Sequence, residues 1–206
     1  MIIDLCEQLL LELQKSRSLV PLYLQPGISR SDVERSLQVA GIDISLPEEV
    51  YSLYGWRNGI DEDESDSEST PFGQLQLFTL GIYISLNLAI QEYAQNAIRQ
   101  SYWPKTLFPL FGSVGGDYYL IDTGNTSLTY GMIMYYSPAN PYFQGAVSIF
   151  DSLESCLRSV TECYSTKAYH FDLDSHYFEI DALREKAIWR KHNPRSEYYK
   201  ILDKFK

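Results

Sequence analysis

The first fifteen residues repeat apolar side chains at the spacing of a helix. Their apolar positions recur every three or four residues, with polar residues between them: Ile2, Leu5, Cys6, Leu9 and Leu13. This spacing places the five side chains on one face of an α-helix, which we predict over residues 2–15.

Two further helices are predicted before residue 60. The first covers residues 28–41, where Ser29 and Ser31 are suited to accept hydrogen bonds from the free backbone amides of the first turn. The second covers residues 45–54, with Ser45 at its start in the position of a helix cap.

The middle of the chain changes to the alternation that is typical of strands. Residues 75–84 alternate apolar and polar side chains about Gly81, which predicts an extended segment with a bend. Ser85 is suited to cap a helix over residues 86–100, and Asp151 a later helix with a buried apolar stripe. Further strands, mainly antiparallel neighbours, are predicted at residues 107–111, 117–122, 131–137 and 146–150.

Composition indicates a globular protein and disfavours a general nucleic-acid binder. The chain has 206 residues, of which 45% are hydrophobic and 21% charged. Its 17 Lys and Arg against 27 Asp and Glu leave a formal charge of -10, which repels phosphate backbones. We expect neither a secretory signal nor a membrane span, because acidic residues interrupt the first helix and no apolar run is long enough. The three cysteines lack the paired spacing of a disulfide scaffold, which favours free thiols in a reducing compartment, the cytoplasm.

The charge is divided unevenly along the chain. Residues 184–206 hold eight Lys and Arg against three acids, which gives +5 and leaves -15 for residues 1–183. A helix is predicted from Asp181 to about His192, and a short amphipathic piece from Tyr198 to Phe205. We therefore expect a compact domain over residues 1–164, followed by a basic helical extension over residues 165–206.

Four segments resemble the SUKH superfamily, the group that contains the Smi/Knr-type cell-wall regulators and many bacterial toxin-immunity proteins. They are LPEEVYSLYGWRNG (46–59), ISLNLAIQEY (84–93), FPLFGSVGGDYYLID (108–122) and SIFDSLESCL (148–157). The resemblance extends over residues 40–164. It implies an α+β fold, with a mostly antiparallel β-sheet and helices packed beside it, and non-enzymatic binding to a partner protein.

Several residues of these segments are expected to serve structure. Asn58-Gly59 and Gly116 are suited to turns that need positive backbone dihedral angles, and Asp117 and Asp122 to turns and strand ends. Trp56 is expected to pack at a helix end with its indole N–H satisfied. The alternative for Trp56 is an exposed aromatic anchor for a partner.

No cofactor, metal or catalytic residue is predicted. His170, Asp172, Asp174 and His176 alternate along one strand face, but four ligands along a strand spread over roughly 20 Å, too far for one ion. Cysteines on an apolar helical stripe, such as Cys156, behave as small buried hydrophobic side chains rather than nucleophiles.

The leading hypothesis is therefore an immunity protein that binds a cognate toxin domain, with nucleases as one candidate class. The expected contacts combine outward strand tyrosines, Tyr118 and Tyr136, with the acidic run Asp61, Glu62, Asp63, Glu64, Asp66 and Glu68. The alternative for this run is a flexible, solvated loop without a part in binding, because runs of charge are usually solvated. The alternative function is an intracellular regulatory scaffold of the cell-wall-regulator type. No direct nucleic-acid or membrane partner is expected, and the oligomeric state stays open.

Overall fold

A five-stranded antiparallel sheet forms the centre of the protein, in a computed structural model that describes residues 1–60, 74–113, 115–172 and 177–205. The strands follow the order β3-β4-β5-β6-β7. Their bounds are Ile82–Tyr83 for β3, Leu107–Gly112 for β4, Tyr118–Asp122 for β5, Ile133–Tyr136 for β6 and Val147–Phe150 for β7. The fold is α+β, as the resemblance implied.

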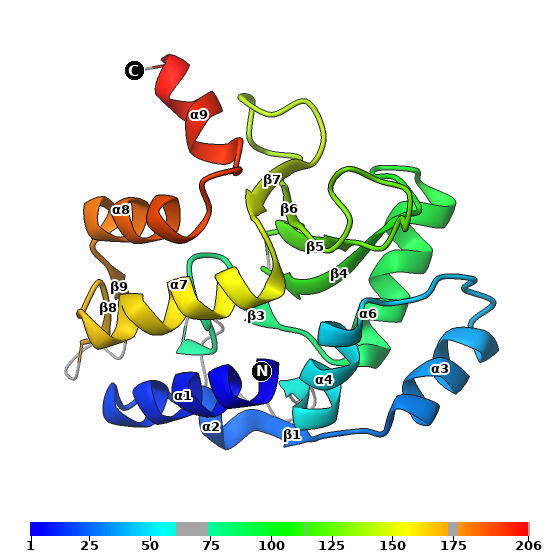
Figure 1. Ribbon diagram of the computed structural model, residues 1–206, viewed down its shortest axis with the longest axis horizontal. Helices are drawn as coiled ribbons and strands as arrows, with labels where there is room; N and C mark the ends of the chain where they lie inside the picture. The colour runs from blue at the N-terminus through cyan, green and yellow to red at the C-terminus, as the bar shows by residue number, and fades with distance from the viewer. Residues whose placement is uncertain (61–73, 114, 173–176, 206) are drawn as a thin grey trace.

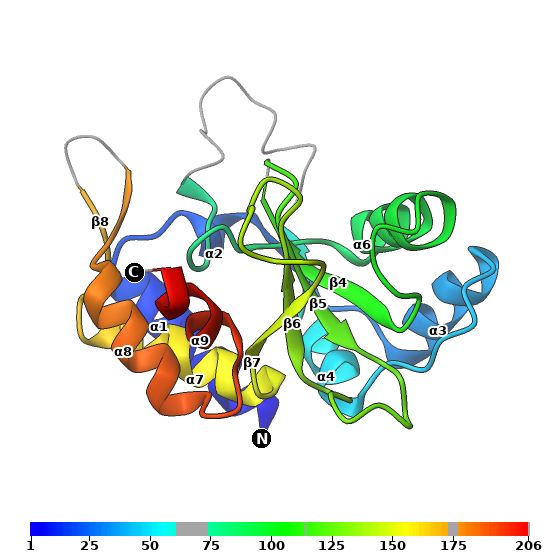
Figure 2. The same ribbon diagram turned by 90° about the horizontal axis from the view of Figure 1, so that it is seen from above.

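Helices cover both faces of this sheet. Figure 2 shows it nearly edge-on, with α1, α7 and α8 on one side and α3 and α6 on the other. The helices of the first side are α1 (Ile2–Lys15), α7 (Leu153–Ser165) and α8 (Ala182–His192). Those of the second are α3 (Arg30–Val39) and α6 (Leu86–Glu92), which continues as the π-helix η2 (Tyr93–Arg99). Helix α4 (Glu48–Trp56) contacts both α1 and α3. None of the described helices is long and apolar enough to cross a membrane.

An aromatic cluster holds the sheet against α8. Phe78 lies at its centre, with ring centroids 4.8 Å from Tyr119, 5.1 Å from Phe111 and 6.0 Å from Phe150. Trp189 of α8 packs on the Phe150 ring at 4.6 Å. Such edge-to-face and tilted contacts contribute beyond the area that they bury.

Phe78 reaches this position through a tight turn, so the prediction of one extended segment over residues 75–84 was largely wrong. The Gly81 amide donates to the Phe78 carbonyl at 2.9 Å, and the Leu77 amide to the Gly81 carbonyl at 2.8 Å. Only the two residues of β3 form a strand. The apolar residues before them are buried in a folded-back segment, which the same alternation does not distinguish from a strand.

Two predicted helix caps were also wrong. Ser152, not Asp151, opens α7, in a capping box where it accepts from the Ser155 amide. Helix α4 begins after Pro47 without a side-chain cap, so Ser45 has no such role, and it extends to Trp56. The predictions for Ser29 and Ser85 were correct, since each side chain accepts a hydrogen bond from the first turn of its helix.

Smaller elements complete the described structure. They are α2 (Val20–Tyr23), β1 (Leu24–Pro26), β2 (Arg57–Ile60), β8 (Tyr169–Phe171), β9 (Phe178–Ile180), α9 (Tyr198–Leu202) and η3 (Asp203–Phe205). Strands β1 and β2 pair, as do β8 and β9, in separate two-stranded sheets. Figure 1 shows α8 and α9 at one end of the molecule and α3 at the other.

The C-terminal segment packs on the body through both apolar and charged contacts. Trp189 is 2% exposed and Tyr169 is fully buried. Glu162 of α7 accepts from Lys191 at 2.8 Å and lies 2.6 Å from the His192 ring nitrogen, and these two partners lower its pKa. Arg195 lies 3.5 Å from Asp151. The basic side chains of this segment are therefore largely paired with nearby acids.

Candidate partner-binding surface

Two tyrosine pairs lie side by side on β5 and β6 and face opposite ways. The registers are Tyr118 opposite Tyr136 and Tyr119 opposite Tyr135. Tyr119 and Tyr135 point into the core and are 2% and 4% exposed, whereas the outer pair is only half-buried. This is the result of strand alternation, and it places the two tyrosines expected from the sequence next to each other on the outer face.

Trp103 lies against both outer tyrosines. Its ring centroid is 5.1 Å from that of Tyr118 and 5.2 Å from that of Tyr136, and its indole N–H donates to the Leu107 carbonyl at 3.1 Å. Trp103 itself is 3% exposed, but the adjacent Tyr102 is 55% exposed. We call Tyr102, Trp103, Tyr118 and Tyr136 the outer aromatic cluster.

A carboxylate fixes the orientation of the cluster. The Tyr118 hydroxyl donates to Glu92 of α6 at 2.5 Å. Burial is the main cause that raises the pKa of Tyr118 well above its ordinary value, and the Glu92 carboxylate adds to the effect. The hydroxyl therefore keeps its proton and remains a donor. Trp103, Tyr102 and Glu92 were not among the residues predicted from the sequence. A tryptophan just before a predicted strand was the available signal, but its contact with β5 and β6 depends on the path of the loop.

Trp56 and Asn58 hold chain segments together. The Trp56 indole donates to Glu7 of α1 at 2.7 Å, and the ring is only 7% exposed, which argues against an exposed anchor. The Asn58 amide donates to Gln25 of β1 at 3.0 Å, and its oxygen accepts from the Leu86 amide at 3.0 Å.

Gly59 has the positive φ expected of it, +73°, but in a different setting from the one predicted. Asn58 and Gly59 belong to strand β2 and not to a turn. A Cβ at Gly59 would lie 2.4 Å from the backbone of Ile84 and Ser85, so glycine permits the close approach of β2 to the start of α6.

The two aspartates lie at turns and strand ends, where the sequence analysis expected them. Asp117 accepts from the Ser113 hydroxyl at 2.9 Å and from the Tyr135 hydroxyl at 2.7 Å, at the turn where Gly116 has φ +84°. Asp122 accepts from the Thr129 hydroxyl at 2.6 Å.

Buried thiols are unsuited to nucleophilic chemistry here. Cys6, Cys156 and Cys163 are all buried, and burial raises the pKa of Cys6 and of Cys163 to about 12 each. The thiols are therefore protonated at neutral pH. The Nε2 atom of His170 lies 2.8 Å from the Glu179 carboxylate, while Asp174 and His176 lie outside the described residues. Within the described ranges, no group of three potential ligands gathers at a metal-binding distance.

The acidic run lies outside the described residues, because these stop at Ile60 and resume at Gln74. That the acidic run binds a partner therefore stays a prediction; its residues are Asp61, Glu62, Asp63, Glu64, Asp66 and Glu68. The described structure contributes the outer aromatic cluster to a candidate interface.

The antiparallel sheet and the helices on its two faces define an α+β protein. The outer aromatic cluster gives it an amphipathic surface that is suited to protein contacts. The family model of the SMI1 / KNR4 family (SUKH-1) matches residues 31–159, and the chain belongs to this family. The match confirms the resemblance carried by the four sequence segments. Membership fits a non-enzymatic immunity or regulatory role. No curated protein matches the chain.

Proposed function

We propose that this protein is a cytoplasmic immunity protein that neutralises a cognate toxin domain by binding it. The outer aromatic cluster carries the proposal. Tyrosine and tryptophan give a large contact area with few rotatable bonds, and they are enriched in protein interfaces. The hydrogen bond from Tyr118 to Glu92 and the tilted ring contact with Trp103 hold the cluster in place before binding, which reduces the entropy lost on association.

The net negative charge of the protein supports a basic partner, such as a toxin that acts on nucleic acid. The chain carries a formal charge of -10, and the C-terminal basic groups are engaged with acids such as Glu162 and Asp203. An acidic body accelerates association with a basic protein by electrostatic steering, and this effect weakens with salt. The acidic run at residues 61–68 is the proposed main source of the field.

The test measures binding between the full chain and the C-terminal domain encoded by the upstream neighbouring gene, at low and moderate salt. We expect nanomolar affinity, on the order of -12 kcal/mol, that weakens as salt is added. A variant with the six acids of residues 61–68 changed to Asn and Gln is expected to associate more slowly and with less salt dependence. Absence of binding at both salt concentrations would overturn the proposal.

The family also contains regulators, which supports the regulatory scaffold as the second candidate. A scaffold binds partners of its own cell and does not require a neighbouring toxin gene. If the neighbouring toxin domain fails to bind, a pull-down from host extract that loses its captured protein when Tyr136 is changed to alanine would favour this candidate.

A further inference from the structure

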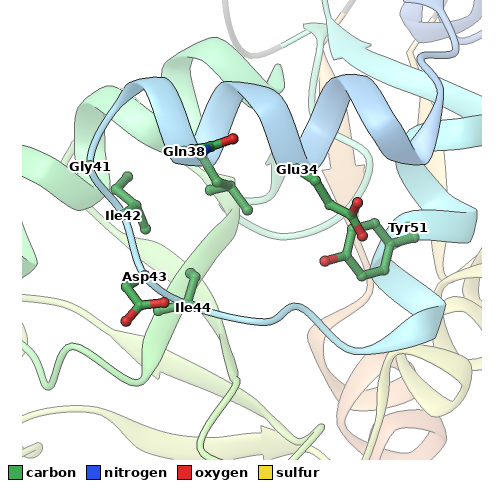
Figure 3. A pocket seen from close by; sticks show the side chains of 8 residues that line it. Glu34, Gln38, Gly41, Ile42, Asp43, Ile44 and Tyr51 are labelled. Carbon is green, nitrogen blue, oxygen red and sulfur yellow. The ribbon is translucent and has the colours of Figure 1, made fainter.

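The end of the molecule that carries α3 is hollowed on both sides of one short segment, Gly41–Ile44. On one side this segment faces α3 across a hollow of about 340 Å³. Figure 3 shows Gln38 and Glu34 of α3 on one wall of this hollow and Tyr51 of α4 at its far end. On the other side lies a larger groove of about 650 Å³, which we call the η2 groove.

The η2 groove has a mixed lining, in which polar residues such as Ser45, Thr106 and Asn125 lie beside apolar side chains that the fold does not bury. Ile98 of η2 is 40% exposed and Tyr130 is 47% exposed, and Ile44 completes this lining. Leu128, between the lining residues Asn125 and Tyr130 in the chain, is fully exposed but does not line the groove. Isolated exposed apolar residues are common, but a group of them around a groove is typical of an interaction site.

The walls of the groove are fixed by hydrogen bonds. The Ile42 amide donates to the Leu37 carbonyl at 2.9 Å, which anchors the Gly41–Ile44 segment to the end of α3. On the opposite wall the Tyr93 hydroxyl donates to the Lys105 carbonyl at 2.6 Å. The groove therefore does not need to form when a ligand arrives.

Two opposite charges lie on the lining of the η2 groove and lack ion-pair partners among the described residues. They are the exposed side chains of Asp43 and Lys105. Glu34 of the neighbouring hollow differs, because it pairs with Arg30 at 2.8 Å. A carboxylate and an ammonium group left unpaired on one groove that also exposes apolar side chains are complementary to a ligand that carries both charges about an apolar centre.

We propose that the η2 groove binds an extended segment of a partner protein in which apolar side chains are flanked by one basic and one acidic residue. The apolar side chains pack on Ile44, Ile98 and Tyr130. The basic residue pairs with Asp43 and the acidic residue with Lys105. This surface is separate from the outer aromatic cluster in its residues, and the proposal does not require the partner to be a toxin.

The test uses short peptides and the full isotope-labelled chain, followed by NMR. The probes are Ac-Arg-Leu-Leu-Glu-NH₂, the reversed order Ac-Glu-Leu-Leu-Arg-NH₂, and the uncharged Ac-Gln-Leu-Leu-Gln-NH₂. We expect at least one charged peptide to shift the amide signals of residues 41–45, 98, 105 and 130. Its dissociation constant should be roughly threefold lower than that of the uncharged peptide, the size expected of exposed ion pairs.

Asp43→Asn and Lys105→Gln are each expected to reduce the preference for the charged peptide. Glu49→Gln is the matched control, since Glu49 is an exposed carboxylate of α4 that does not line the groove. Because Asp43 and Lys105 are exposed, the variants should keep the dispersed amide spectrum of the folded chain. Shifts confined to other residues, or an equal preference in Asp43→Asn and Glu49→Gln, would overturn the proposal. Binding of a toxin domain to another surface of the protein would not support this proposal.

Discussion

The backbone amide of Glu197 lies 3.1 Å from both the carbonyl oxygen and the hydroxyl oxygen of Ser148, to which it donates. Ser148 is in β7, the last strand of the central sheet. The Ser196 hydroxyl donates to the same carbonyl at 3.1 Å, and the Asp151 amide donates to Asn193 at 2.9 Å. Residues 193–197 therefore cover the free edge of β7, which would otherwise be open to pairing with another chain.

Removal of residues 193–206 is expected to cause self-association. The truncation leaves Ser148 and Asp151 with unpaired backbone groups at an apolar strand edge. Sedimentation velocity should show oligomers that grow with concentration. A chain that ends at residue 203 keeps the edge cover and should sediment as the full chain does. Equal behaviour of both truncations would contradict this role.

Trp189→Ala is expected to destabilise the protein by about 3–5 kcal/mol, the usual result of deleting a large buried aromatic side chain. Trp189 is 2% exposed and its ring packs on Phe150 at 4.6 Å, so the substitution leaves a cavity between α8 and the sheet. Denaturant unfolding measures the change. Leu183→Ala on the same helix is the control, because Leu183 is 81% exposed. Its effect should stay within about 0.5 kcal/mol.

The same measurement tests the domain boundary proposed near residue 164. If residues 165–206 are an independent extension, residues 1–164 alone should unfold cooperatively with little loss of free energy. We expect the opposite, because Trp189 and Tyr169 are buried against the body. The fragment should lose its cooperative transition or aggregate.

Glu185 is expected to make stability fall as the pH rises from acidic values. The side chain is 7% exposed and accepts from the Thr79 hydroxyl and, at 2.5 Å, from the Tyr169 hydroxyl. Burial raises the pKa of Glu185 above its ordinary value of 4.5. Above that pH the unfolded chain loses the proton while the folded chain retains it, so the free energy of unfolding decreases until the pH passes the folded pKa.

Glu185→Gln removes this dependence and keeps an oxygen that accepts both hydroxyl donors. The variant should therefore gain stability relative to the original chain between about pH 4 and neutral pH. Denaturant unfolding at a series of pH values gives the difference. Glu49→Gln, at an exposed position, is the control and should show no such trend. A constant difference for Glu185→Gln across the series would contradict the prediction.

Tyr102→Ala and Tyr136→Ala are each expected to weaken toxin binding by more than about 1 kcal/mol, if the outer aromatic cluster is the interface centre. Tyr102 is 55% exposed and Tyr136 half-buried, so the folded structure should tolerate both changes. Calorimetric titration against the toxin domain measures the effect. Tyr177→Ala, beside the β8–β9 hairpin, removes a tyrosine that is 64% exposed elsewhere and should bind as the original chain does.

Local sequence patterns predicted much of the secondary structure. The apolar spacing of residues 2–15 matches α1 residue for residue, and the strands predicted after residue 107 all form. The alternation at residues 118–119 and 135–136 also correctly assigned one tyrosine of each pair to the core. These features depend on periods of two and 3.6 residues, which neighbouring residues specify by themselves.

Secondary structure was predicted less well where a short sequence is compatible with more than one local conformation. Asn58-Gly59 suits a turn, yet in this fold the Asn58 amide joins β1 to the start of α6. Ser152 rather than Asp151 caps α7, and the Asp151 carboxylate instead lies 3.5 Å from Arg195, 44 residues further along the chain. Both cases involve residues that lie far apart in the chain.

The sequence by itself determined the α1 helix, the strand order along the chain, the acidic excess and the outward direction of Tyr118 and Tyr136. Only the tertiary structure decided that Trp103 lies on those tyrosines, that Phe78 turns into the core, and that residues 193–197 cover β7. The reason is physical. Periodicity is set by the backbone geometry of a few neighbouring residues, whereas these contacts join segments brought together only when the apolar core closes.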